Sequence, residues 1–121
     1  MSALTTVVGP TVEVSTEKEK QIASAQAKCP EGSRAVSGGG YGGIAGLLDS
    51  EMEASHTAWF IIVYNKTGIT VKIHAAVECA AAGQAVAARF PRTAHSRLDE
   101  RLAELRAEAE AERAIAPNPP K

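Results

Sequence analysis

The stretch ITVKIHAAVEC, residues 69–79, carries an apolar side chain or a cysteine at every second position, and the side chains between them are polar except for Ala76. Successive side chains of a β-strand point to opposite faces of the sheet, so this period of two predicts a strand. One face is expected to be core and the other largely solvated, as in an antiparallel sheet. The side chains expected to face the core are Ile69, Val71, Ile73, Ala75, Val77 and Cys79.

The run WFIIVY, residues 59–64, lies just before this stretch and is apolar or aromatic throughout. Its length and its β-branched residues predict a strand that is covered on both faces. Trp59 and Phe60 would then point to opposite faces, and one of them would anchor the core. The residues NKTG between the two strands, positions 65–68, predict a hairpin turn.

Further strands are predicted upstream. Residues 11–14 follow a proline and alternate, as a short edge strand does. Residues 22–29 carry small side chains on one face, which is typical of a half-buried strand. Those side chains are Ala23, Ala25, Ala27 and Cys29. Residues 44–55 fit either a short helix or a bulged strand. Together these elements predict a mainly β domain over residues 10–80, either a small antiparallel β-sandwich or a barrel-like fold.

The run GGGYGG, residues 38–43, is expected to turn the backbone at the centre of this domain. It also spells the dinucleotide-binding motif G-x-G-x-x-G through Gly38, Gly40 and Gly43. That motif needs a buried strand before it, whereas residues 33–37 are short and polar. The rest of the chain also supplies too few strands for such a domain. Dinucleotide binding is therefore the most distant alternative.

Cys29 and Cys79 are the two cysteines of the chain. A structural zinc site needs four ligands at short spacings, and a redox pair needs C-x-x-C, so neither pattern fits. Two interpretations stay open at this point. The cysteines form one disulfide that closes a loop of about fifty residues, or they are two buried thiols.

Residues 96–116 carry a helical pattern. Ser96 followed by Asp99 resembles a capping box, and apolar side chains recur at spacings of four and three residues. The apolar positions are Leu98, Leu102, Leu105 and Ala109. A stripe this narrow does not stabilise an isolated helix in water. The helix is therefore expected to dock on its own domain, to self-associate or to bind another protein, and the acids and arginines elsewhere on it are spaced for ion pairs within the helix.

The chain has 121 residues, of which 45% are hydrophobic, which is enough for one modest domain. Residues 1–9 are expected to form an N-terminal arm, residues 81–95 an alanine-rich linker or docking segment, and residues 117–121 a proline-rich tail. The formal net charge of −1 argues against a nucleic-acid partner. No run approaches the roughly 18 apolar residues that span a bilayer, so no membrane partner is expected.

No set of residues predicts catalysis, a cofactor or a metal centre, so the chain is not expected to be an enzyme. His56, His74 and His95 are scattered, without the short spacings of metal ligands. No serine lies in a nucleophile elbow. The three acids of the segment DSEME, residues 49–53, alternate and could share a face for a cation. A solvated strand or loop edge is the preferred interpretation of these acids.

Several motifs occur in a specific order: CPEG at 29–32, GGGY at 38–41, Trp59, Asn65 and VECA at 77–80. This order resembles that of a small β domain found in actinobacterial proteins and in their phages. The resemblance covers most of the predicted β domain. It implies that the two cysteines pair in a disulfide and that the domain is an accessory or surface module rather than an enzyme.

Many proteins of this kind are exported, whereas this chain lacks the charged and apolar regions of a signal peptide and ends in a charged helix. We therefore hypothesise a virion component, such as a capsid decoration or minor tail protein, which is synthesised in the cytoplasm and displayed on the particle. Its expected partners are other virion proteins or further copies of itself, held through the helix. The alternative is a soluble cytoplasmic or extracellular module that binds a carbohydrate or a protein through Tyr41 and Trp59.

Overall fold

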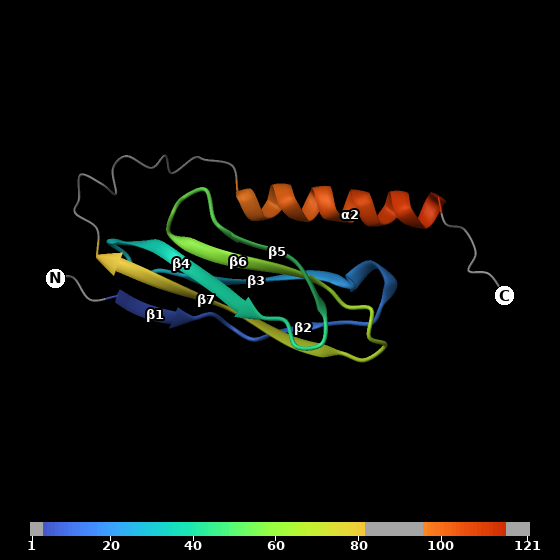
Figure 1. Cartoon of the computed structure of the whole chain (residues 1–121), viewed down its shortest axis with the longest axis horizontal. Helices are drawn as coiled ribbons and strands as arrows, with labels where there is room; N and C mark the ends of the chain where they lie inside the picture. The colour runs from blue at the N-terminus through green and yellow to red at the C-terminus, as the bar shows by residue number, and fades with distance from the viewer. Residues whose placement is uncertain (1–3, 82–95, 116–121) are drawn as a thin grey trace.

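The computed structural model describes residues 4–81 and 96–115 as two antiparallel sheets with one helix on the outside (Figure 1). Its elements are β1 (Leu4–Val8), β2 (Val12–Val14), the short helix η1 (Lys18–Lys20), β3 (Ile22–Lys28), β4 (Ser33–Tyr41), β5 (Gly46–Met52), β6 (Ala58–Tyr64), β7 (Val71–Ala81) and α2 (Arg97–Ile115). The mainly β fold predicted from the sequence is confirmed as a small sandwich. Residues 82–95 and 117–121, most of the predicted linker and the predicted tail, lie outside the described residues.

Sheet 1 is built around β7, which pairs with β4 on one side and with β1 and β2 in succession on the other. The predicted alternation holds along this strand. Its buried side chains are Val71, Ile73, Ala75, Val77 and Cys79. Ile69 was also expected to face the core, and this expectation is wrong. The strand begins only at Val71, and Ile69 is 58% exposed in the preceding turn.

The first strand occupies a segment for which the sequence predicts only an arm. Residues 4–8 form β1, which pairs with the end of β7, and Val7 packs against the core between the sheets. The N–H of Gly9 still donates to the carbonyl oxygen of Ala75 at 2.8 Å. Pro10 has no N–H to donate and separates β1 from β2, so the two short strands act as one interrupted edge strand.

Sheet 2 has the strand order β3-β6-β5. β6 is covered on both faces, as predicted. Ile61 and Val63 belong to the core between the sheets, whereas Phe60 and Ile62 belong to a second cluster beneath α2. The bulged-strand alternative for residues 44–55 is confirmed, because the register of β5 against β6 shifts after Leu47.

The connection from β6 to β7 crosses from one sheet to the other, so the hairpin predicted over residues 65–68 is wrong. Asn65 directly follows β6 and is fully buried at this crossing. Its side-chain N–H groups donate to the carbonyl oxygens of Val14 at 3.0 Å and Ile69 at 2.8 Å, while its own side-chain oxygen accepts the N–H of Thr67 at 3.0 Å. These bonds join β2, the turn and β6, which no local pattern reveals.

The glycine run is only partly a turn. Gly38 and Gly40 lie within β4, where a Cβ atom would stand 2.3 Å from Cγ of Trp59 and 2.8 Å from Cδ1 of Ile61, respectively. These two glycines therefore let the side chains of β6 approach the backbone of β4. The chain reverses only at residues 42–45, where Gly43 has a φ of 59°. The expected backbone bend is thus correct for the second half of the run and wrong for the first.

The two neighbouring positions Gly38 and Gly39 allow a matched test of this close approach. We expect Gly38→Ala to lower the free energy of unfolding by about 1–3 kcal/mol, because the new methyl group overlaps the Trp59 ring. Gly39→Ala meets no atom within 4 Å and is expected to change stability by less than about 1 kcal/mol. Urea denaturation of both variants measures the difference, and equal effects would contradict the packing role of Gly38.

Candidate functional site

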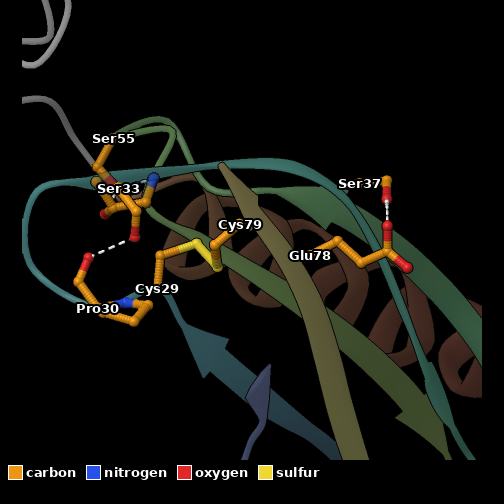
Figure 2. Close-up of a disulfide and its surroundings, with 8 residues drawn as sticks. Cys29, Pro30, Ser33, Ser37, Ser55, Glu78 and Cys79 are labelled. Atoms are coloured by element: carbon orange, nitrogen blue, oxygen red, sulfur yellow. Dashed lines mark hydrogen bonds between the residues drawn. A yellow bond between two sulfur atoms is a disulfide. The ribbon is translucent and has the colours of Figure 1, made fainter. Parts of the chain in front are cut away.

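One disulfide joins the two sheets (Figure 2). Cys29 follows β3 of sheet 2, and Cys79 lies on the inner face of β7 in sheet 1, with 5.7 Å between their Cα atoms. The adjacent turn is held by the hydroxyl of Ser33, which donates to the carbonyl oxygen of Pro30 at 2.6 Å. The pairing implied by the resemblance is confirmed, and the alternative of two buried thiols is wrong.

The helix α2 covers the outer face of sheet 2 within its own chain (Figure 1). Leu105 and Ala109 are buried, and Leu98 and Leu102 are partly buried against the same cluster. The sheet contributes Ile22, Phe60 and Ile62 to this contact, with Tyr64 at its margin. Of the three alternatives that the sequence leaves open for this stripe, docking on its own domain is therefore confirmed, and its four residues are not available for self-association while α2 is docked.

Acidic side chains of β5 meet basic side chains of α2 along this contact. Nε of Arg97 lies 3.0 Å from Oε1 of Glu51, and Nε of Arg101 lies 2.9 Å from Oδ2 of Asp49 and 3.5 Å from Oε2 of Glu51. Arginines four residues apart on a helix are separated by about 6 Å along its axis, and acids two residues apart on a strand by about 7 Å. The two spacings match, so the charges are in register. The later arginine, Arg101, meets the earlier acid, Asp49, so α2 runs antiparallel to β5.

A third acid, Glu53, binds the start of α2. It directly follows β5 and is 8% exposed. Its carboxylate accepts the N–H groups of Arg97 and of Leu98, the latter at 3.3 Å, and the hydroxyl of Ser96 at 3.0 Å. These N–H groups lack partners within the helix, and the helix dipole also favours a negative charge there. Ser96 accepts the N–H of Asp99 at 3.2 Å, so its predicted capping role is confirmed.

These three acids, Asp49, Glu51 and Glu53, form what we call the docking strip. The pattern of these acids predicts a solvated edge, and that prediction is wrong because the edge is occupied by α2. The arginines are assigned to pairs within the helix, and the pair of Arg97 with Glu100 is indeed present at 3.3 Å. The sequence did carry a signal of this contact, because acids at every second position of a strand match the spacing of arginines at every fourth position of a helix.

The two acids within β5 have pKa values that move in opposite directions. Burial raises the pKa of Asp49, but hydrogen bonds with Glu51 and with Arg101 outweigh burial, so the pKa is lowered overall. The pKa of Glu51 is raised, first by its hydrogen bond with Asp49 and then by burial, against the opposing effect of Arg97. Two neighbouring carboxylates disfavour a second negative charge, so the pair takes up its first proton at Glu51.

These shifts predict opposite effects at neutral pH. A lowered pKa means that ionised Asp49 stabilises the fold at neutral pH, and this contribution is lost as the pH falls through the lowered pKa. A raised pKa means that ionised Glu51 opposes folding at neutral pH, and this effect disappears as the pH falls through the raised pKa. Asp49→Asn is therefore expected to lower Tm by about 1–4 °C at neutral pH. Glu51→Gln is expected to keep or raise Tm, with the gain vanishing at mildly acidic pH.

Circular dichroism melts of the two variants and of the unchanged chain, recorded from neutral to mildly acidic pH, test these signs. Both substitutions are close to isosteric, so each serves as the matched control of the other. A fall in Tm of the same size for both variants at neutral pH would contradict the assignment of the shared proton to Glu51.

The structure does not bring Tyr41 and Trp59 to one surface. Trp59 points between the sheets over Gly38, and its indole N–H donates to the hydroxyl of Ser50 at 2.8 Å. Tyr41 lies on the opposite side of sheet 1, 60% exposed, with its ring centroid 5.8 Å from that of His74. The two aromatic residues therefore do not form the single binding surface predicted from them, and of the two only Tyr41 is exposed.

Sheet 1 presents an outer face that none of the described residues covers. On β7 this face carries His74, Ala76 and Glu78, which alternate with the buried residues of the strand. We call outer face these three residues together with the residues of β1 and β4 on the same side, Leu4, Thr6, Val8, Ser37, Gly39 and Tyr41. Leu4 and Val8 are 55% and 63% exposed. A shallow groove of about 130 Å³ crosses this face over Gly39 and Ala76. Its polar end is marked by the hydroxyl of Ser37, 3.4 Å from Glu78 (Figure 2).

The glycine motif has no phosphate-binding geometry. Gly38 and Gly40 are strand residues, and the segment after Gly43 forms β5 rather than a helix, so the motif is not followed by a helix N-terminus. Within residues 4–81 and 96–115, the structure shows no cluster of histidine, cysteine and acidic side chains that would hold a metal ion. His95 lies outside the described residues.

Comparison with known proteins adds no relative. No protein-family model, no curated protein and no solved structure matches this chain. In the part of the chain that the structure describes, no helix is long and apolar enough to cross a membrane.

Proposed function

We propose that this chain is a non-enzymatic structural or interaction module that contacts its partner through the outer face of sheet 1. The observation that carries the proposal is the exposure of Leu4, Val8 and Tyr41 on a face that the described residues leave uncovered. Sheet 2 is already covered by α2, so the two sides of the sandwich have different roles. Leu4 and Val8 lie on one side of β7 and Tyr41 on the other, all on the same face. Exposed apolar side chains on one face are typical of interaction sites.

The disulfide bears on where such a module works. Disulfides form and persist in oxidising surroundings such as the extracellular space and the surface of a virion. A bond between Cys29 and Cys79 therefore favours display outside the cytoplasm. The most specific form of the proposal is a virion component, such as a capsid decoration or minor tail protein, whose outer face binds another virion protein or a second copy of this chain.

Particles produced by a host that carries this gene provide the test. Mass spectrometry and immunogold electron microscopy of purified particles are expected to detect the chain on their surface. Val8→Glu changes an exposed residue of the outer face, so it is expected to fold normally and to lower the amount incorporated. Ile69→Glu is the matched control, because Ile69 is similarly exposed but lies in the turn before β7. Particles that lack the chain would overturn the virion proposal.

A second candidate function is a saccharide- or protein-binding module that works through Tyr41. The specific observation is its exposed ring on the same face as a shallow groove with hydroxyl and carboxylate groups at one end. An exposed aromatic ring provides an apolar surface for a sugar ring, and Tyr41 adds a hydroxyl at its edge. A glycan array is expected to show a signal that Tyr41→Ala removes. A signal that survives in Tyr41→Ala, or an empty array together with an empty pull-down, would exclude this function.

A further inference from the structure

A small notch lies where the second half of α2 crosses the end of sheet 2. Its volume is about 210 Å³. Its polar lining comes from Lys18 of η1, the following Gln21, Tyr64 of β6, and Arg106 and Glu110 of α2. Pockets for drug-sized ligands begin at about 300 Å³. The notch is therefore suited to one functional group and its immediate attachment.

Basic side chains from separate elements converge on this notch. Lys18 and Arg106 line it, and Nζ of Lys66, from the turn after β6, lies 4.7 Å from the centroid of the Tyr64 ring. One carboxylate, that of Glu110, stands on the lining as well. Two cations, Lys18 and Arg106, line the notch with one carboxylate, so the local balance favours an anionic ligand.

Arg106 differs from the other two arginines that α2 directs at the domain. Arg97 and Arg101 each meet a carboxylate of the docking strip. Across the same contact, Arg106 donates from Nη2 to the main-chain oxygen of Ile22 at 3.3 Å. A guanidinium carries five N–H donors in a planar fork that matches a carboxylate, and this bond uses one of them.

We propose that the notch binds a carboxylate ligand, with Arg106 as the planar donor and Lys18 as the second cation. The Tyr64 ring forms an aromatic wall for the carbon to which the carboxylate is attached. This site is separate from the outer face of sheet 1, so the inference goes beyond the proposed function and does not depend on it. Because the ligand bridges η1 and α2, binding also holds the second half of α2 against the domain.

The test is a titration of the full chain followed by ¹⁵N–¹H NMR, with succinate as a small acid and N-acetylglutamate amide as a model of an acidic side chain. We expect saturable shifts at Gln21, Tyr64 and the Nε–H of Arg106. Arg106→Gln and Lys18→Gln are each expected to weaken binding at least about tenfold. Arg34→Gln is the matched control, because Arg34 is an exposed residue of β4 away from the notch.

Sodium chloride at matched ionic strength and inorganic phosphate complete the experiment. Shifts that grow without saturation, that chloride reproduces, or that persist in a folded Arg106→Gln variant would overturn the site. Saturation with phosphate but not with succinate would overturn the carboxylate class. Saturation with both acids supports the site as proposed, and the tighter of the two identifies a small organic acid or an acidic side chain as its ligand.

Discussion

Removal of the disulfide is expected to lower the free energy of unfolding by about 4 kcal/mol in the chain-entropy model. Cys29 and Cys79 are separated by 50 positions, and their bond restricts the unfolded chain over most of the β domain. A domain of this size has only about 5–15 kcal/mol of net stability, so the loss is a large fraction of the total. Urea denaturation of the Cys29→Ala, Cys79→Ala double variant measures it.

Each single variant is the control for the double variant. Either substitution alone breaks the bond, so Cys29→Ala is expected to lose nearly as much stability as the double variant, after allowance for the thiol left at Cys79. The unchanged chain treated with a reductant should fall to the same level. A loss below about 1 kcal/mol would contradict the role of the bond in holding sheet 1 to sheet 2.

Asn65→Asp is expected to destabilise the fold by about 3 kcal/mol or more. The amide of Asn65 donates to the carbonyl oxygens of Val14 and Ile69 at a fully buried position. A carboxylate there loses both donors and places a negative charge against those oxygens. Burial and this repulsion raise the folded-state pKa of the introduced carboxyl group, so stability should recover as the pH falls through that raised pKa.

Asn65→Ala separates the two causes. It removes the hydrogen bonds without adding a charge, so its cost is expected to depend little on pH. The two variants are compared by thermal unfolding from neutral to acidic pH. Equal stabilities of Asn65→Asp and Asn65→Ala at neutral pH would contradict the proposed repulsion, and wild-type stability of both would contradict the role of Asn65 at the crossing.

Local periodicity predicted several elements well. The alternation from Val71 to Cys79 and the continuous apolar run of β6 correspond to strands with the expected faces. The helix was predicted at nearly its observed bounds, since a capping serine and an apolar stripe are local signals. Such patterns depend only on where successive side chains point, which the backbone geometry of each element settles by itself.

Pairing between distant segments was predicted less well. A turn signal at residues 65–68 indicated a hairpin, because short turns usually join paired strands. The chain instead crosses to the other sheet, and hydrogen bonds from the buried amide of Asn65 hold this crossing. β1 was missed because residues 4–8 contribute mainly exposed side chains, and pairing with β7 is what orders them.

In the glycine run, too, the local conformation was predicted and the contacts with a distant segment were not. Its composition indicated a turn, and Gly43 does adopt a positive φ. Gly38 and Gly40 are required for another reason, the approach of Trp59 and Ile61 from β6. A glycine that bends the backbone and a glycine that makes room for a neighbour look identical in a sequence, because the neighbour is some twenty positions away.

The amino-acid sequence by itself determined the strand faces of β6 and β7, the amphipathic helix and the β-rich class of this domain. The tertiary structure alone decided the division into two sheets, the docking of α2 in cis and the separation of Tyr41 from Trp59. It also decided the role of the docking strip, whose acids meet arginines about fifty positions away. The physical reason is that side-chain direction is a property of one element, whereas contact and charge pairing are properties of two.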